Sequence, residues 1–321
     1  MISAPIFFMK KIIVNKLSTL TGHKDCVYTL EKSSENDIFY SGAGDGMVVA
    51  WDMKDPGTGK LVAKVPSSVY AIHYYQPADT LVIGQNFAGI HWIDPVEKKE
   101  KGSLKISEAA FFDIQSYEDK LIIASGDGVI TMVDFYKKSI VKQIEASAKS
   151  ARTIAINHQQ GEFAVGFSDN YIRIYDANTF ALKHEFEAHK KSVFTLKYFP
   201  DNNLLISGSR DAHLKFWDAK NNYEMKESIV AHMYAINNVY FSPQGDHFVS
   251  CSMDKSIKVW DTKQLKLLKV IDKARHAGHG TSVNKLFWSE YYNRLVSCSD
   301  DRTISIWDLN FNNHENNTTR N

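Results

Sequence analysis

The stretch VSCSMDKSIKVWD occupies residues 249–261, and VSCSDDRTISIWD occupies residues 296–308, 47 positions later. The two stretches share one alternation of apolar and polar residues, a polar centre and a terminal Trp-Asp. This pattern is typical of a strand, a tight turn and a second strand. A duplication of this length indicates a chain built from repeated units, with further copies elsewhere.

Similar units fill the rest of the chain. Each ends in an aspartate that follows an apolar or aromatic residue, and successive aspartates lie 42, 40, 42, 42, 43 and 47 residues apart. Such a period is long enough for a small β-sheet. The terminal aspartates are Asp52, Asp94, Asp134, Asp176, Asp218, Asp261 and Asp308.

Four of the seven units also carry a spaced polar set. A histidine is followed by a serine after 18 residues, an aspartate after 4 more and a tryptophan after 6 more. Chance does not explain four identical spacings of four residue types. The sets are His23, Ser41, Asp45 and Trp51; His189, Ser207, Asp211 and Trp217; His232, Ser250, Asp254 and Trp260; and His279, Ser297, Asp301 and Trp307.

These motifs resemble those of the WD-repeat β-propeller family over residues from about 9 to 309. They comprise GH at residues 22–23 and 278–279, AH at 188–189 and 231–232, and the Trp-Asp endings. The resemblance implies an all-β fold of seven blades, each with four antiparallel strands, around a channel. It also implies that each polar set forms a hydrogen-bonded structural network inside its blade.

The residues of the fifth unit independently agree with a blade. SVFTLKYF, NLLISGS and HLKFWD are short runs rich in β-forming residues, separated by the turn sequences PDNN and RDA. One blade cannot bury both of its faces, so like blades stack side by side.

Closure of the ring is predicted from its two ends. The segment at residues 10–20 is a surplus strand, whereas the seventh unit ends at Asp308 without an outer strand. We therefore expect residues 12–17 to pair with the strand at residues 304–307. This gives a single domain over residues 1–309 and a polar, disordered tail at residues 310–321.

Units 2, 3 and 4 lack most of the polar set, and we expect apolar contacts to replace it. Losing all partners together can be nearly neutral, so seven blades remain the prediction and a six-bladed ring the alternative. The residues at the histidine, serine and tryptophan positions are Val65, Lys105 and Ser147; Ile83, Ile123 and Val165; and Ile93, Val133 and Tyr175, while Asp127 and Asp169 remain.

Patterns that could carry chemistry each have a structural explanation. An active site is needed once, whereas the His-Asp pairs recur from blade to blade. SGAGDG at residues 41–46 precedes a strand, not the helix N-terminus that a phosphate loop requires. His276 and His279 could seat a metal, but His279 belongs to a network. We therefore expect no catalytic residue, cofactor or metal, and no enzyme.

Composition restricts the partners. With 38 basic and 37 acidic residues the net charge is +1, so no overall field attracts nucleic acid or an anionic membrane.

The N-terminal residues have the wrong order for a signal peptide. Cys26, Cys251 and Cys298 are too few for a disulfide framework. The expected protein is cytoplasmic and monomeric by itself.

A scaffold for a protein or peptide partner is the function that these observations favour. In the family, exposed positions on the narrow face lie one and three residues after the network histidine and one before the network aspartate. The alternative is an enzyme or small-ligand binder that uses the central channel. The candidate partner-binding residues are Lys190, Ser192, Arg210, Met233, Tyr234, Ala235, Met253, Ser282 and Asp300.

Overall fold

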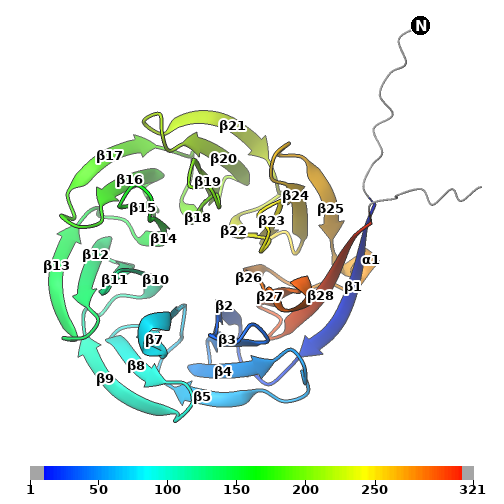
Figure 1. The fold of residues 1–321 in the computed structure, drawn as a ribbon, viewed down its shortest axis with the longest axis horizontal. Coiled ribbons are helices and arrows are strands. Elements are labelled where there is room, and N and C mark those ends of the chain that lie inside the picture. Colours follow the sequence, from blue (N-terminus) through cyan, green and yellow to red (C-terminus); the bar gives the residue numbers. More distant parts are fainter. Residues whose placement is uncertain (1–10, 313–321) are drawn as a thin grey trace, which may run out of the picture.

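The computed structural model describes residues 11–312, which form seven four-stranded antiparallel sheets arranged as blades around a channel (Figure 1). The prediction of a seven-bladed β-propeller is therefore confirmed, and the six-bladed alternative is wrong. In each blade one strand lies beside the channel and another lies at the outer rim (Figure 1).

The strands follow, from the channel outward. Blade 1 has β2 (Val27–Lys32), β3 (Ile38–Ala43), β4 (Met47–Asp52) and β5 (Lys60–Lys64); blade 2 has β6 (Ala71–Tyr75), β7 (Thr80–Gln85), β8 (Gly89–Asp94) and β9 (Lys99–Lys105). Blade 3 has β10 (Phe111–Tyr117), β11 (Lys120–Ser125), β12 (Val129–Asp134) and β13 (Ser139–Glu145); blade 4 has β14 (Ala151–Asn157), β15 (Glu162–Phe167), β16 (Tyr171–Asp176) and β17 (Leu182–Glu187). Blade 5 has β18 (Val193–Tyr198), β19 (Leu204–Ser209), β20 (His213–Asp218) and β21 (Glu224–Val230); blade 6 has β22 (Ile236–Phe241), β23 (His247–Ser252), β24 (Ile257–Asp261) and β25 (Leu267–Ile271). Blade 7 has β26 (Val283–Trp288), β27 (Leu295–Ser299), β28 (Ile304–Asn312) and β1 (Lys11–Leu20).

The N-terminal strand closes the ring, as predicted. β1 pairs antiparallel with β28, so that Lys16 lies opposite Trp307 and Leu20 lies opposite Ile304. β28 extends to Asn312, so residues 310–312, which the sequence assigned to the tail, form part of a strand. Residues 313–321 lie outside the described residues.

The hydrophobic core lies between neighbouring blades. Val27 and Trp51 of blade 1, for example, are buried in one cluster with Val296 and Ile304 of blade 7. This is the burial expected of units that each need a neighbour to cover their faces.

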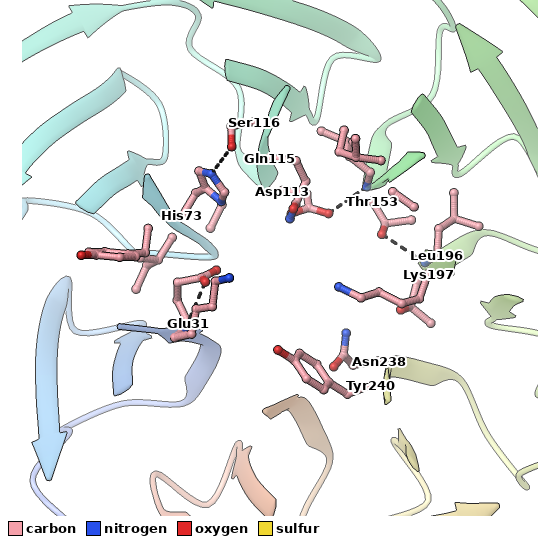
Figure 2. Close-up of a pocket in the computed structure, with 18 of the residues that line it drawn as sticks. Glu31, His73, Asp113, Gln115, Ser116, Thr153, Leu196, Lys197, Asn238 and Tyr240 are labelled. Carbon is pink, nitrogen blue, oxygen red and sulfur yellow. Dashed lines mark hydrogen bonds between the residues drawn. The ribbon is translucent and has the colours of Figure 1, made fainter. Parts of the chain in front are cut away.

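Hydrogen bonds also tie successive inner strands together around the channel. Asp113 Oδ2 accepts from the Ile154 backbone N–H at 2.8 Å, and Thr153 Oγ1 accepts from the Leu196 N–H at 3.2 Å (Figure 2). Thr195 continues the series by accepting from the next inner strand. The inner strands are thereby held as a rigid wall.

Within residues 11–312, helical structure is limited to α1 (Lys273–His276) and the 3-10 turns η1 (Gln76–Ala78) and η2 (Tyr291–Asn293). α1 lies in the longest return loop, between β25 and β26. None of the helices in this part of the chain has the length and apolar character needed to cross a bilayer.

Candidate functional site

The four residues of each polar set lie together inside their blade. In blade 5, Trp217 Nε1 donates to Ser207 Oγ at 2.8 Å. The same Ser207 Oγ lies 2.7 Å from His189 Nε2. His189 Nδ1 lies 3.1 Å from an Asp211 carboxylate oxygen. One tautomer satisfies the whole chain: Ser207 donates to Nε2, and Nδ1–H donates to Asp211.

The other three sets repeat this geometry. The contacts between serine Oγ and histidine Nε2 measure 2.8 Å in blades 1 and 6 and 2.9 Å in blade 7. The tryptophans Trp51, Trp260 and Trp307 each donate to the serine of their own blade. The same network therefore links the loop and the strands in blades 1, 5, 6 and 7.

The charge state of these networks is set by burial and by backbone donors. Burial lowers the pKa of His189, although Asp211 acts in the opposite direction. Burial alone would raise the pKa of Asp211, but donors from His189, Lys190 and His213 hold it far below its usual range. The blade 5 network thus holds a neutral histidine and an ionised aspartate, with the central serine Ser207 buried away from solvent.

Blade 4 keeps more polar contact than the sequence suggested. Ser147 Oγ donates to Asp169 at 2.7 Å, and Arg173 Nη1 lies 2.9 Å from the same carboxylate. Serine and arginine therefore partner the aspartate where the histidine is missing.

In blade 3 the expected alignment at the histidine position is wrong. The Ile106 N–H donates to Ala88 O at 3.0 Å, the contact that Ala188 makes with Asn170 just before His189. Ser107, not Lys105, therefore occupies the histidine position. The hairpin between β10 and β11 is two residues shorter than that between β18 and β19. The constant spacing assumed between the histidine and serine positions therefore pointed to a residue two places too early.

The predicted partner-binding residues of blade 6 mostly lie at the surface. Met233 is 81% exposed, Tyr234 is 61% exposed, and Met253 is also exposed. The Met253 N–H donates to Ala235 O at 3.0 Å, so the two loops lie side by side. Ala235 itself is only 3% exposed, so its prediction as a surface residue is wrong.

The candidates in blades 5 and 7 differ in availability. Lys190 and Arg210 are exposed in adjacent loops of blade 5, where the Arg210 N–H donates to O of the half-buried Ser192 at 2.9 Å. Ser282 and Asp300 of blade 7 are half-buried. Both are bound by neighbouring asparagine side chains, at 2.9 and 2.7 Å, which leaves less of them free for a partner.

A second group at the same mouth was not anticipated. The inner strands β2, β10, β14, β18, β22 and β26 have a register shift near their first residue, which leaves one residue in a bulge. In four blades this residue lies five positions after the network histidine, a spacing that the sequence contained. The bulged residues are Tyr28, Phe112, Arg152, Phe194, Asn237 and Asn284, and Tyr70 precedes β6 at the matching place.

Five of these side chains form a continuous row across blades 1 to 5. Ring centroids are 4.5 Å apart between Tyr28 and Tyr70, and 5.8 Å apart between Tyr70 and Phe112. The Arg152 guanidinium carbon lies 3.8 Å from the Phe112 ring centroid and 4.8 Å from that of Phe194. Aromatic surface therefore borders more than half of the mouth.

The channel encloses a cavity of about 650 Å³ lined by inner-strand residues of all seven blades. Glu31, His73, Lys197 and Tyr240 project into it from different sides (Figure 2). Lys197 Nζ lies 5.3 Å from the Tyr240 ring centroid, and His73 Nε2 lies 2.8 Å from Ser116 Oγ.

The enclosure shifts the acidity of these groups. Separation from bulk water raises the pKa of Glu31 to about 7, although Lys32 and Lys285 favour its ionised form. The same cause lowers the pKa of His73 to about 4. The pKa of Lys197 is lowered chiefly by burial in the channel and to a smaller extent by repulsion from Lys285. Across residues 11–312, no three His, Cys, Asp or Glu side chains are grouped to hold a metal.

Comparisons with known proteins agree with the propeller fold and the repeated networks. The family described as WD40, "WD domain, G-beta repeat", matches residues 14–52, 180–218, 224–261 and 270–308. Each segment contains one complete network, together with outer-strand residues of the preceding blade. The WD40 β-propeller domain of Doa1 superposes with a TM-score of 0.81 at 18% identity, covering 92% of this chain and 97% of that domain. At this identity the likeness shows the fold.

Two curated relatives are similar over most of the ring. Striatin from Mus musculus is 23% identical over 243 residues, which are 68% of this chain and 31% of striatin. The guanine nucleotide-binding protein subunit beta of Solanum tuberosum is 22% identical over 227 residues, which are 64% of this chain and 59% of that subunit. The chain thus spans about a third of the length of striatin.

Proposed function

The chain is a WD-repeat β-propeller, and from this premise we propose that it is a non-catalytic scaffold that binds a peptide segment of a protein partner. The binding surface is the blade 5–6 patch, which we define as Lys190, Arg210, Met233, Tyr234 and Met253. The observation that carries the proposal is the exposure of two methionines and a tyrosine in adjoining loops of blade 6.

The chemistry of the patch suits a short peptide. Methionine is flexible and polarisable, so Met233 and Met253 can adapt to an apolar side chain, and Tyr234 adds rigid contact area. Lys190 and Arg210 supply cations in the next blade, and Arg210 can bind a carboxylate through two parallel N–H donors. The expected ligand therefore carries an apolar anchor beside an acidic residue.

The networks support a scaffold more than an enzyme. Each central serine is buried, and each histidine already uses both ring nitrogens within its blade. The network residues therefore hydrogen-bond with one another, and the networks of blades 5 and 6 hold the loops that carry the blade 5–6 patch. The named relative from Solanum tuberosum is itself a subunit of a larger protein, and the three free cysteines suit the cytoplasm.

The channel gives a second candidate function, the binding of a small ligand. Its cavity brings Glu31 and Lys197 together with His73 and Tyr240, and perturbed ionisable groups in one pocket are typical of ligand sites. A small ligand in the channel would depend on Lys197 and not on Met253.

Paired substitution tests the scaffold proposal. The double variant Met253→Glu/Arg210→Glu should lose the proteins that the wild-type chain retrieves from native lysate, with an almost unchanged unfolding midpoint, because both side chains are exposed. Quantitative mass spectrometry of the captured proteins measures the loss.

A matched double variant serves as control. Met225→Glu/Lys220→Glu makes similar changes at exposed positions in and beside the outer strand of blade 5. It should retain the captured proteins. If the patch variant retains them too, the blade 5–6 patch is not the binding surface.

A further inference from the structure

Arg152 lies at the channel mouth between two aromatic rings. It is the bulged residue of β14, and Phe112 and Phe194 hold the same place in the neighbouring inner strands β10 and β18. The guanidinium carbon is 3.8 Å from one ring centroid and 4.8 Å from the other. Both distances are within the range of cation–π contact, so the rings fix the position of the guanidinium.

No anion in the described chain neutralises this guanidinium. Among residues 11–312, no carboxylate oxygen lies within 4.0 Å of it and no hydrogen bond engages its nitrogens. Burial lowers the pKa of Arg152 to about 10, and Tyr70 opposes the shift, so the side chain stays cationic at neutral pH. A partly desolvated cation without a partner is unfavourable and favours an incoming anion.

The nitrogens of this guanidinium are not fully enclosed, and Arg152 as a whole is half-buried. They make no hydrogen bond, yet they are not among the fully enclosed polar atoms of the described residues that lack a partner. Because rings of neighbouring blades flank the guanidinium, its N–H groups are offered along its edge. The edge of a guanidinium matches a carboxylate through two parallel hydrogen bonds, a geometry that lysine cannot provide.

We propose that Arg152 is the binding site for a carboxylate side chain, aspartate or glutamate, of the peptide that occupies this face. The inference rests on the proposed function, because it adds a second contact for the same peptide. Blade 4 adjoins blade 5, so Arg152 and Phe194 form the end of the row that lies nearest the blade 5–6 patch. The row formed by Phe112, Tyr70 and Tyr28 would receive apolar residues next to the acidic one.

Side-chain NMR of the full chain tests the site directly. The probes are the capped peptide acetyl-Leu-Ala-Glu-Leu-amide, its Gln counterpart and inorganic phosphate, each titrated against the arginine Nε–Hε resonances. The Arg152 resonance, assigned through Arg152→Lys, should shift saturably with the Glu peptide. The Gln peptide should bind about tenfold more weakly, because it lacks the charge that strengthens the hydrogen bonds.

Two variants separate the site from general electrostatics. Arg152→Gln should abolish the saturable binding, and Arg152→Lys should weaken it about tenfold, because lysine keeps the charge without the fork. Lys149→Gln removes the same charge from an exposed position in the preceding loop and should leave binding unchanged. The unfolding midpoint of each variant is measured as well, and binding is compared among variants whose midpoint equals that of the wild type.

Three results would overturn the inference. They are an Arg152 resonance that does not respond to the Glu peptide, equal binding of the Gln peptide or of phosphate, and an equal loss of binding in Lys149→Gln. The outcome is distinguishable from failure of the scaffold proposal. The NMR titration reports on Arg152 alone, whereas protein capture by the Met253→Glu/Arg210→Glu variant reports on the blade 5–6 patch.

Discussion

Each network serine contacts two side chains, the tryptophan and the histidine, and the histidine in turn contacts the aspartate. The cost of losing one partner therefore depends on the contacts that remain. Asp211 accepts from His189 and from the backbone N–H groups of Lys190 and His213. Asp127 in blade 3 is exposed and contacts Ser125, whose hydroxyl also reaches Val129 O at 2.8 Å. The two aspartates hold matching places in unequal surroundings.

Asp211→Ala should therefore lower the free energy of unfolding by about 1–3 kcal/mol, because it leaves a buried imidazole N–H without an acceptor. Asp127→Ala should cost less. Urea denaturation of both variants measures the difference. Equal losses would show that the complete network makes Asp211 no more stabilising than Asp127. We also expect Asp169→Ala to lower the free energy of unfolding by less than Asp211→Ala does, because the Asp169 network lacks its histidine. The difference should be small, because Ser147 and Arg173 still contact Asp169.

Glu31 couples the channel to pH. Its pKa is raised to about 7, so the folded chain keeps a proton that the unfolded chain releases near its ordinary value of 4.5. The protonated carboxyl thus favours folding at low pH, and this contribution is lost as the pH rises through 7. Glu31→Gln has a neutral side chain at every pH.

The stability of Glu31→Gln relative to wild type should therefore increase between pH 5 and pH 8. Urea denaturation of both proteins at the two pH values gives the comparison. A relative stability that stays constant, or falls as the pH rises, would show that the Glu31 carboxyl is not held in its protonated form.

Among the elements, β1 is the strand that closes the ring, because it pairs with β28 near the other end of the described chain. Leu20 is buried between blades 7 and 1, whereas Leu17 of the same strand is exposed. Leu20→Ala should cost about 2–5 kcal/mol through the cavity it leaves, and Leu17→Ala about 0.5 kcal/mol or less.

Thermal unfolding of the Leu20 and Leu17 variants measures this difference. A single cooperative transition that shifts in Leu20→Ala alone would support closure of the ring by β1. Similar midpoints for the two variants would contradict it.

The sequence could predict elements better than contacts between them. Constant spacing identified the seven units and their polar sets, because each depends on one hairpin or on one repeated period. The resemblance to WD-repeat propellers then implied the blades and the networks, and the surplus N-terminal strand predicted the closure of the ring. The shift from Lys105 to Ser107 escaped it, because one hairpin is shorter. The site at Arg152 also escaped it, because Phe112 and Phe194 meet Arg152 only when three blades stand side by side.

In the whole molecule, the ring converts short loops into one rigid face. Inner strands are tied to one another around the channel, and the four networks anchor loops in blades 1, 5, 6 and 7. Blades 4 to 6 then present cationic, aromatic and methionine side chains at a common mouth. A face held in this way can bind a peptide without reorganising, which lowers the entropic cost of binding.

Site-specific photo-cross-linking tests the central claim, that this face binds a protein partner, most directly. Tyr234 in the blade 5–6 patch is 61% exposed, and Tyr136 at the turn between β12 and β13 is 60% exposed. A benzophenone amino acid placed at either position in the full chain, followed by irradiation in the native cell, gives a comparison matched in residue type and exposure. The account predicts a discrete covalent adduct from position 234 and none from position 136. Adducts of equal yield at both positions, or an adduct from position 136 alone, would contradict it.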